Sequence, residues 1–328
     1  MLKIFVSGAD GFVGSNLLRE LLSRNYSIVA FVQSGIDPHT IKNLDIDISY
    51  GDLLLPETID LAMKDCDIVI HTAAITSIWP YRSDIQKNVN IKGTKNIIEA
   101  AKKHKIKRFI HIGTANSFGF GSKENPGDEN QPYMAGKYKM DYMDTKYEAH
   151  KLVLDEVKNN SFPAIIVNPA FMFGPFPSKF GSATMIESIY KQKVPGYTKG
   201  GRNYIAVKDV CVAIANAVVQ GVIGECYLLA NKNLNYKEAF TLIAEVAGVK
   251  PPGIYLPAPI VLLYSRLLTF LAKIGKYQPS VNYQMARMSL EGHYYTSKKA
   301  VSDLNLPQTS VKKAIEEAFV WMKDNQVL

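Results

Sequence analysis

A tyrosine and a lysine four residues apart can perform acid–base chemistry on a carbonyl or an alcohol. On a helix the two side chains share one face, and an ammonium group beside a phenol lowers the pKa of the phenol. Reduction of a ketone needs such a proton donor beside the carbonyl that accepts a hydride. The spacing alone is a weak signal here, because it begins at six positions: Tyr133, Tyr142, Tyr147, Tyr204, Tyr294 and Tyr295.

The surroundings of these pairs favour Tyr142 with Lys146. The helix face that starts at Tyr142 continues through Ala149 and Val153, a small and apolar stripe that suits packing. The face that starts at Tyr147 carries two further lysines and suits solvent. The other pairs lie in the loop that leads to this helix, in an expected strand, or far from the expected sheet. We therefore predict that Tyr142 is the proton donor and that Lys146 acidifies it.

A hydroxyl group that holds the substrate oxygen is expected at the end of a strand beside this helix. The apolar run at 108–112 is followed by Gly113 and Thr114, so Thr114 is the candidate. The alternative is an ordinary turn at the end of a strand. Thr114, Tyr142 and Lys146 thus form the predicted catalytic set, which contains no metal ligand.

A glycine-rich turn follows the first apolar run of the chain. Its three glycines have the spacing GxxGxxG, and an amphipathic pattern begins directly behind them. The first glycine permits a tight turn, the second lets a pyrophosphate approach the backbone, and the third lets helix and strand pack closely. Free N–H groups at the helix start then face the phosphates. We predict that a dinucleotide is held by Gly8, Asp10, Gly11, Phe12, Val13 and Gly14.

Strand-like and helix-like patterns alternate over the first 170 residues. Such alternation implies parallel strands with helices on both faces, joined by right-handed crossovers. The predicted fold class is therefore α/β, with a doubly wound parallel sheet of the Rossmann type. The expected strands are 3–7, 27–32, 46–50, 67–71, 108–112 and 164–167, and the expected helices are 13–24, 57–64, 85–104 and 142–158.

The pattern changes after Pro169, and helical periodicity dominates the rest of the chain. We predict a dinucleotide-binding Rossmann domain over residues 1–170, to which later segments return. A smaller, mostly helical substrate-binding part is expected over residues 171–328. Its expected helices are 183–192, 207–220, 236–247, 260–274 and 310–324.

The second and third expected strands carry the candidates for binding adenosine. An acid after the second strand commonly binds the ribose of NAD, but this strand ends in Gln33 and the next acid, Asp37, comes late. Asp10 in the glycine turn would repel the 2′-phosphate of NADP, so the choice between NAD and NADP stays open. Asp52, followed by Leu53, can accept the adenine amino group, with a turn-capping acid as the alternative.

The composition is typical of a globular protein, with 47% hydrophobic and 21% charged residues. Three cysteines without paired spacing argue against a disulfide framework or a zinc site. The net charge is +8, but the basic residues are scattered, so we expect a small-molecule substrate and no nucleic-acid partner. The chain opens directly on a strand pattern without a signal peptide, and we expect a cytoplasmic protein.

The most apolar long stretch is Ile254–Ile274. Pro257, Pro259 and Arg266 make it a poor membrane span, so no transmembrane segment is expected. We predict a buried helix of the substrate-binding part, with peripheral attachment to a membrane interface as the alternative.

The chain resembles the extended (atypical) short-chain dehydrogenase/reductase family, of the NAD-dependent epimerase/dehydratase superfamily, along nearly its whole length. The resemblance implies an NAD(P) cofactor, and it implies that Thr114 and Tyr142 bind the reacting oxygen while Lys146 binds the nicotinamide ribose. It rests on the glycine turn, on His71-Thr72-Ala73-Ala74, on Asn90-Ile91-Lys92-Gly93-Thr94, on Thr114 and on the run Tyr142-Met143-Asp144-Thr145-Lys146-Tyr147-Glu148-Ala149.

Further roles follow from the same resemblance. Asn90 is expected to belong to a proton relay, with a structural amide as the alternative. Helix-mediated dimers are common in such proteins, so a homodimer is an expectation. The cofactor contacts implied in addition to the glycine turn come from Thr72, Ala73, Ala74, Pro169 and Phe171.

Within the family, the pattern is closest to the dihydroflavonol reductase-like and 3β-hydroxysteroid dehydrogenase-like members. Family dehydratases carry an Asp-Glu pair after the catalytic hydroxyl, where this chain has Ala115-Asn116. Epimerases of the UDP-galactose type offer an Asn to a phosphate where this chain has Phe171, and a phosphate facing Phe loses its hydrogen bonds. Arg202, however, matches a family arginine that contacts nucleotide phosphates.

The expected function is hydride transfer between NAD(P) and a secondary alcohol or ketone of a largely apolar small molecule. A sugar-nucleotide epimerase is the alternative, supported by Arg202. A non-catalytic NAD(P)-binding regulator is a second alternative, against which the complete Thr-Tyr-Lys set argues. The residues expected to face the substrate form an aromatic and Met-rich set: Thr76, Ser77, Trp79, Tyr81, Phe118, Phe171, Met172 and Phe173, with Arg202 beside them.

Overall fold

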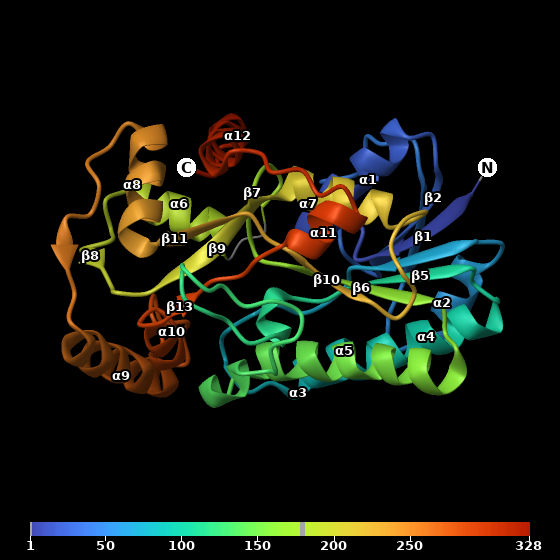
Figure 1. Cartoon of the computed structure of the whole chain (residues 1–328), viewed down its shortest axis with the longest axis horizontal. Helices are drawn as coiled ribbons and strands as arrows, with labels where there is room; N and C mark the ends of the chain where they lie inside the picture. Colours follow the sequence, from blue (N-terminus) through green and yellow to red (C-terminus); the bar gives the residue numbers. More distant parts are fainter. Residues whose placement is uncertain (1, 178–180) are drawn as a thin grey trace.

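A seven-stranded parallel sheet forms the centre of the molecule (Figure 1). The computed structural model describes residues 2–177 and 181–328. The strand order is β10-β6-β5-β4-β1-β2-β3, and each neighbouring pair is parallel, which confirms the predicted fold class. The strands are β1 Lys3–Ser7, β2 Ser27–Gln33, β3 Asp47–Gly51, β4 Ile68–His71, β5 Arg108–Ile112, β6 Ala164–Pro169 and β10 Cys226–Leu229.

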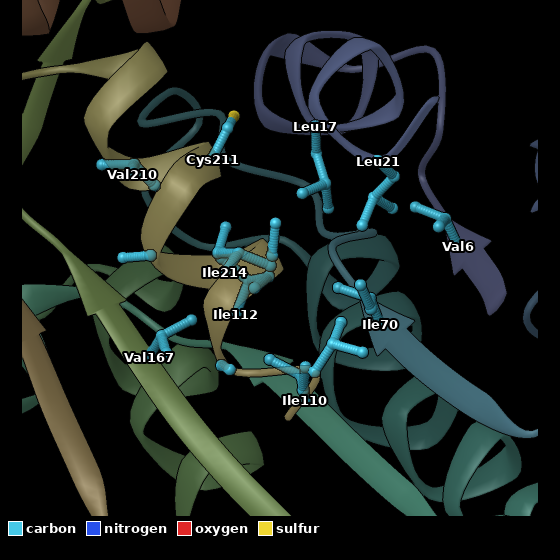
Figure 2. Close-up of a cluster of buried hydrophobic side chains, with 14 of the residues drawn as sticks. Val6, Leu17, Leu21, Ile70, Ile110, Ile112, Val167, Val210, Cys211 and Ile214 are labelled. Atoms are coloured by element: carbon cyan, nitrogen blue, oxygen red, sulfur yellow. The ribbon is translucent and has the colours of Figure 1, made fainter. Parts of the chain in front are cut away.

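Helices cover both faces of this sheet (Figure 1). One face carries α1 (Phe12–Ser23) and α7 (Val207–Asn216), and the other carries α2 (Pro56–Met63), α4 (Thr94–Lys103) and α5 (Asp141–Asn160). Because the central strands are covered on both faces, they are nearly continuous apolar runs, whereas the edge strand β3 is only partly buried. Figure 2 shows the core on the first face, where Leu17 and Leu21 of α1 and Ile214 of α7 lie over side chains of the strands.

The segment expected as one helix at 85–104 is divided into three parts. A short helix, α3 (Asp84–Lys87), leads into a π-helix, η1 (Asn88–Gly93), and only then does α4 begin. The Thr94 hydroxyl donates to the carbonyl oxygen of Asn90 at 2.7 Å, one turn earlier. Single π-turns of this kind are rare and often lie at functional sites, and hydrophobic periodicity does not reveal them.

The second part of the chain is built on a small sheet that the sequence analysis missed. Strands of two to six residues are too short to show a periodic pattern. Strand β9 (Gly201–Ala206) pairs with β7 (Phe171–Phe173), β11 (Lys232–Asn235) and β13 (Gly292–His293), and β8 (Gly196–Tyr197) pairs separately with β12 (Ile254–Tyr255). Around these strands lie α6 (Ser182–Tyr190), α8 (Tyr236–Ala247), α10 (Tyr283–Met288) and α12 (Val311–Asp324), while α11 (Lys298–Asp303) packs on β10.

Helix α9 (Ala258–Gly275) is not the buried helix that its apolar sequence predicted. Its buried residues are the small Ser265, Thr269 and Ala272, whereas its large apolar side chains are mostly exposed. The expectation was wrong because hydrophobicity alone does not say which face of a helix has a partner. Among the described residues, α9 is the one helix that is long and apolar enough to cross a membrane by length and composition.

Candidate active site

The predicted catalytic hydroxyls meet at the carboxyl end of β5. Thr114 lies two residues beyond β5, and Tyr142 lies in the first turn of α5, which packs against that end of the sheet. The Thr114 hydroxyl lies close enough to the Tyr142 phenol to act on its pKa, which it lowers. The Thr114 oxygen also accepts from the backbone N–H of Asn116 at 3.3 Å, so its own proton is left for the Tyr142 oxygen or a ligand.

Lys146, which is predicted to acidify the phenol, contacts a backbone carbonyl in this structure. Its ammonium group donates to the backbone carbonyl of Ile112 at 2.5 Å, and burial lowers the pKa of Lys146 to about 8. Burial raises the pKa of Tyr142, while the hydrogen bond from Thr114 and the charge of Arg202 act in the opposite direction. The cation whose charge lowers the pKa of Tyr142 in this structure is Arg202, whereas Lys146 is held by the backbone carbonyl.

Arg202 reaches this position from β9, in the second part of the chain. Its Nε donates to the hydroxyl of Tyr236 at 2.9 Å, and its guanidinium carbon lies 5.2 Å from the centre of the Phe171 ring. Within the described residues, no ion pair joins it to a carboxylate. A guanidinium buried without an acid is costly, so this cation remains available to a ligand beside Tyr142.

The side chain of Asn90 is fully occupied. Its oxygen accepts from the N–H of Ile75 at 2.8 Å, and its nitrogen donates to the carbonyl of Ile75 and to the Thr145 hydroxyl, both at 3.0 Å. These contacts match the structural amide that was the alternative to a proton relay. Asn90 joins the loop after β4 to the helix that carries Tyr142 and Lys146, and it holds both in place.

The glycine turn fits a dinucleotide. Gly8 has φ of 65°, and a Cβ atom there would lie 2.6 Å from Cα of Ala73. No side chain caps the first turn of α1 within the described residues, so the amides that open this helix are left for an anion. Gly11, at the tip of the turn, is exposed. The residues present therefore fit the pyrophosphate of NAD(P).

Substituting Gly14 tests this turn. A Cβ at Gly14 would lie 2.1 Å from the Gly8 carbonyl oxygen and 2.8 Å from Cα of Ala9, both of which are backbone atoms. We expect Gly14→Ala to destabilise the protein by about 1–3 kcal/mol and to weaken NAD(P) binding, measured by thermal unfolding and fluorescence titration. Gly253→Ala is the control, because nothing lies within 4 Å of its Cβ position. Equal effects of the two variants would contradict the role given to Gly14.

The remaining predicted cofactor residues lie along the same edge of the sheet. Because the strands are parallel, the segments behind β1 to β6 emerge side by side. Gln33 is exposed at the end of β2, and Asp52 follows β3 with one oxygen accepting from the N–H of Leu54 at 2.8 Å. The Thr72 hydroxyl donates to the carbonyl of Ser7 at 2.6 Å. The same edge carries the other predicted cofactor residues, which are Leu53, Ala73, Ala74, Pro169 and Phe171.

The predicted substrate residues separate into two groups. Trp79 and Tyr81 pack edge to face at 5.6 Å in the loop after β4, where Thr76 is exposed. Phe118, in contrast, is buried edge to face on His150 at 5.4 Å, and Met172 of β7 packs against the core. The first group is accessible to a ligand, whereas the second serves packing in this structure.

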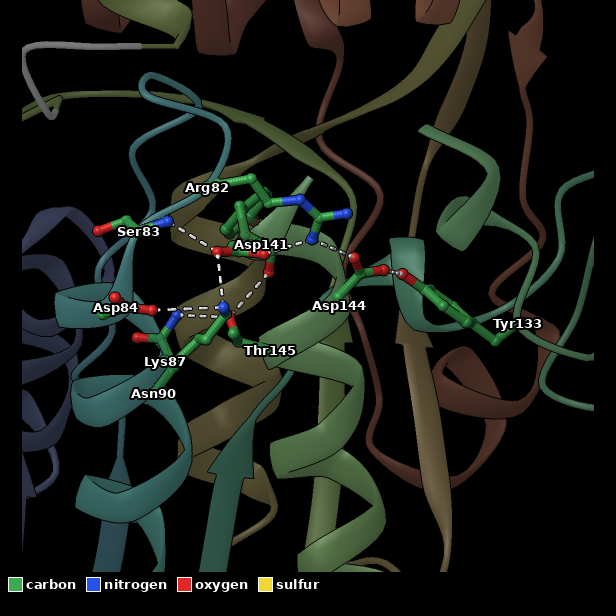
Figure 3. A network of polar contacts seen from close by, with 10 residues as sticks. Arg82, Ser83, Asp84, Lys87, Asn90, Tyr133, Asp141, Asp144 and Thr145 are labelled. Atoms are coloured by element: carbon green, nitrogen blue, oxygen red, sulfur yellow. Dashed lines mark hydrogen bonds and ion pairs between the residues drawn. The ribbon is translucent and has the colours of Figure 1, made fainter. Parts of the chain in front are cut away.

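The sequence analysis missed an ionic network that anchors the start of α5 (Figure 3). The buried carboxylate of Asp141 accepts from Arg82 at 2.5 Å and from the N–H of Ser83 at 2.7 Å. Asp144 accepts from the Tyr133 hydroxyl at 2.7 Å. The network ties the loop after β4 to the turn that carries Tyr142. Acids are common in the first turn of any helix, so sequence alone does not mark these two.

A group of buried histidines was missed as well. His71 ends β4 between the hydroxyls of Ser7 at 2.7 Å and Thr94 at 3.0 Å, and its ring centre lies 5.4 Å from that of His111 on β5. Burial lowers the pKa of His71 to about 3 and that of His150 to about 4, and it holds the pKa of His111 well below its usual range. The charge of Lys146 acts on all three in the same direction. The sequence signal that could have revealed His71 is a polar residue at the end of an apolar strand.

Comparison with known proteins places the chain among its relatives. A model of the NAD dependent epimerase/dehydratase family matches residues 4–230. The chain is 29% identical to "Putative dihydroflavonol 4-reductase" of Synechocystis sp., covering 98% of this chain and 94% of that protein. It is 24% identical to a 3-beta-hydroxysteroid dehydrogenase of Mycolicibacterium neoaurum, covering 98% of this chain and 92% of that protein. The crystal structure of gox2253 superposes with a TM-score of 0.85 at 29% identity, covering 98% of each chain.

Proposed function

Because the chain belongs to the NAD dependent epimerase/dehydratase family, as its motifs predicted, we propose that it transfers a hydride between NAD(P) and a secondary alcohol or ketone. The substrate of this NAD(P)-dependent oxidoreductase is a largely apolar small molecule. The observation that carries the proposal is the neighbouring pair of hydroxyls, Thr114 and Tyr142, at the carboxyl end of β5. Two hydroxyls at one point can hold a single carbonyl oxygen.

The bound NAD(P) supplies or accepts the hydride. Thr114 and Tyr142 bind the substrate oxygen, and the raised pKa of Tyr142 keeps its phenol protonated at neutral pH. A protonated phenol is the form that gives a proton to the oxygen of a ketone during reduction. Lys146, fixed at the carbonyl of Ile112, would hold the ribose of the cofactor.

Aromatic side chains near the hydroxyl pair support an apolar substrate. Phe171 packs edge to face on Tyr204 at 5.6 Å, and Trp79 packs in the same way on Tyr81. Two relatives are named for reactions of dihydroflavonols and of 3-beta-hydroxysteroids, which are ring compounds with a secondary alcohol or ketone. Ala115 and Asn116, which follow Thr114, provide no acid–base pair for the elimination of water.

The direct test is an assay of the purified protein with NADH and NADPH on cyclic and steroid ketones, with sugar nucleotides in parallel. We expect loss of NAD(P)H absorbance with at least one class of apolar ketone. Interconversion of a UDP- or dTDP-sugar without any ketone reduction would overturn the proposal. NAD(P) binding without turnover on any of these compounds would favour a regulator.

A second candidate function is epimerisation of a sugar nucleotide, and Arg202 is the observation that favours it. Its guanidinium has no carboxylate partner among the described residues and faces Tyr142. A phosphate would satisfy this cation, because guanidinium and phosphate form strong paired hydrogen bonds. The ring of Phe171 beside it offers no such bonds and argues against a diphosphate.

Replacing Arg202 by Met separates the two candidates. For an apolar ketone we expect KM to change by less than about threefold, since no charged contact is lost, and kcat to fall at most modestly. For a sugar nucleotide we expect binding to weaken by more than about thirtyfold, because a charge-assisted contact is removed. Steady-state kinetics and isothermal titration with UDP-sugars measure the two effects. Arg24→Met, directly after α1 and far from the site, is the control variant.

A further inference from the structure

The outer face of α9, formed by Ile260, Leu263, Leu267, Phe270 and Ile274, carries more exposed large apolar side chains than any other helix that the structure describes. These residues follow one another at helical spacing, and each is between 54% and 71% exposed. Tyr264 and Leu271 of the same helix widen the stripe, and Ile254 and Tyr255 of β12, shortly before the helix in the chain, are exposed as well. A contiguous apolar surface of this kind marks an interaction site rather than scattered exposed residues.

The opposite face of α9 is the one that packs on the protein. Ser265 and Ala272 are buried there, and the Thr269 hydroxyl accepts from the backbone N–H of Tyr283 at the start of α10, at 2.8 Å. The helix therefore buries small and polar residues and exposes large apolar ones. In a helix surrounded by water the arrangement is normally the reverse.

The chain segment that carries this face has charges of a single sign. Residues 246–290 contain five basic residues and no Asp or Glu, so they carry five of the chain's eight net positive charges. Four of the five are exposed, namely Lys250, Arg266, Lys273 and Lys276. Tyr255, Tyr264 and Tyr277 are exposed among them, and tyrosine is enriched where membrane meets water.

We propose that the outer face of α9 docks this protein onto an anionic phospholipid surface, with the helix lying in the plane of the interface. The exposed leucines, isoleucines and Phe270 enter the acyl boundary, and the surrounding lysines contact the headgroups. The charge pattern disfavours a second copy of the chain as the occupant. A symmetric contact through α9 would bring Arg266 and Lys273 against the same cations of the partner without an acid between them.

The docking face adjoins the loop expected to face the substrate. The Nζ atom of Lys273 lies 5.2 Å from the centre of the Tyr81 ring. A small pocket between α9 and α10 is lined by Tyr81, Thr269, Phe270 and Tyr283. Asn282, at the start of α10, donates to the carbonyl of Ile78 at 3.4 Å. At Figure 1's lower left, α9 and α10 occupy the end of the molecule remote from β2. Docking would therefore bring the Trp79–Tyr81 loop near the lipid, although the inference does not depend on the proposed reaction.

Co-sedimentation of the full chain with vesicles tests the proposal. We use vesicles of phosphatidylcholine alone and of phosphatidylcholine with an equal amount of phosphatidylglycerol. We expect preferential binding to the anionic vesicles, which weakens with salt. The double variant Leu263→Gln/Leu267→Gln should lower the partition coefficient at least about tenfold. Lys273→Gln/Lys276→Gln should lower it roughly tenfold on anionic vesicles only.

The control variant is Leu61→Gln/Lys64→Gln on α2, which changes an exposed leucine and a nearby exposed lysine elsewhere. It should bind vesicles like the unchanged protein, and all variants should keep their thermal unfolding midpoint and NAD(P) affinity. Unchanged protein that stays in the supernatant with anionic vesicles overturns the proposal. A dimer in sedimentation equilibrium that Leu263→Gln/Leu267→Gln dissociates would overturn it in favour of a contact between copies.

Discussion

Replacing Tyr142 by Phe is expected to lower kcat for ketone reduction by about a hundredfold to ten-thousandfold, the usual contribution of a positioned proton donor. The variant keeps the ring and removes only the hydroxyl that meets Thr114. The ketone oxygen would then lose its proton donor and one of its two hydrogen bonds. Steady-state kinetics with saturating cofactor measures the effect.

Tyr147→Phe is the matched control for this experiment. Tyr147 stands on the same helix and also has a lysine four residues later, but its ring stacks on Tyr133 at 4.1 Å, away from Thr114. We expect it to retain activity, and we expect both variants to bind NAD(P) like the unchanged protein. Retained activity in Tyr142→Phe together with loss in Tyr147→Phe would show that the wrong pair had been chosen.

Acidification below about pH 6.5, the usual pKa of histidine, is expected to destabilise the protein steeply. His71, His111, His150 and His293 are buried, and burial lowers the pKa of each, to about 3, 4 and 3 for His71, His150 and His293. The unfolded chain therefore binds more protons than the folded one between these values and 6.5, so stability rises with pH in that window and is lost as pH falls. At about pH 5 the cost is about 2 kcal/mol for each of His71, His150 and His293, or roughly 6 kcal/mol together, and His111 acts in the same direction.

A loss of that size is comparable to the whole stability of a typical domain, about 5–15 kcal/mol. Urea unfolding at a series of pH values measures it. His111→Leu should reduce the slope of unfolding free energy against pH by one proton, because neither ring nitrogen of His111 has a partner among the described side chains and backbone groups. His39→Leu, at an exposed position, should leave the slope unchanged. A stability that is flat from neutral pH to about pH 5 would contradict the assignment.

The parallel sheet and its cofactor edge could be predicted because their signals are local. Most strands of the first half are apolar runs, and turn residues that follow neighbouring strands, such as Gly8 after β1 and Thr72 after β4, lie beside each other once the strands are parallel. The helix at Tyr236–Ala247 was predicted with its observed bounds, since Asn235 and Glu238 form a capping box that marks its start.

What could not be predicted depends on contacts between distant segments. The cation that acts on Tyr142 comes from β9, and nothing in the local pattern at Arg202 identifies the phenol that it faces. The same holds for the buried histidines, since the neighbours of His71 alone lie on β1, on β5 and on α4. The sequence of α9 shows that the helix is apolar, but only the fold shows that its small residues take the inner side.

The two halves of the chain are interleaved, which bears on how the protein can be taken apart. Strand β10 pairs with β6 as the outermost strand, and α7 packs against α1, although both come after residue 200. A fragment ending at Pro169 would leave β6 with an open edge and the leucines of α1 in water, and such edges recruit other chains. Separate expression of a nucleotide-binding module should therefore yield aggregates. A usable minimal fragment has to run through Leu229, which nearly coincides with the end of the family match at residue 230.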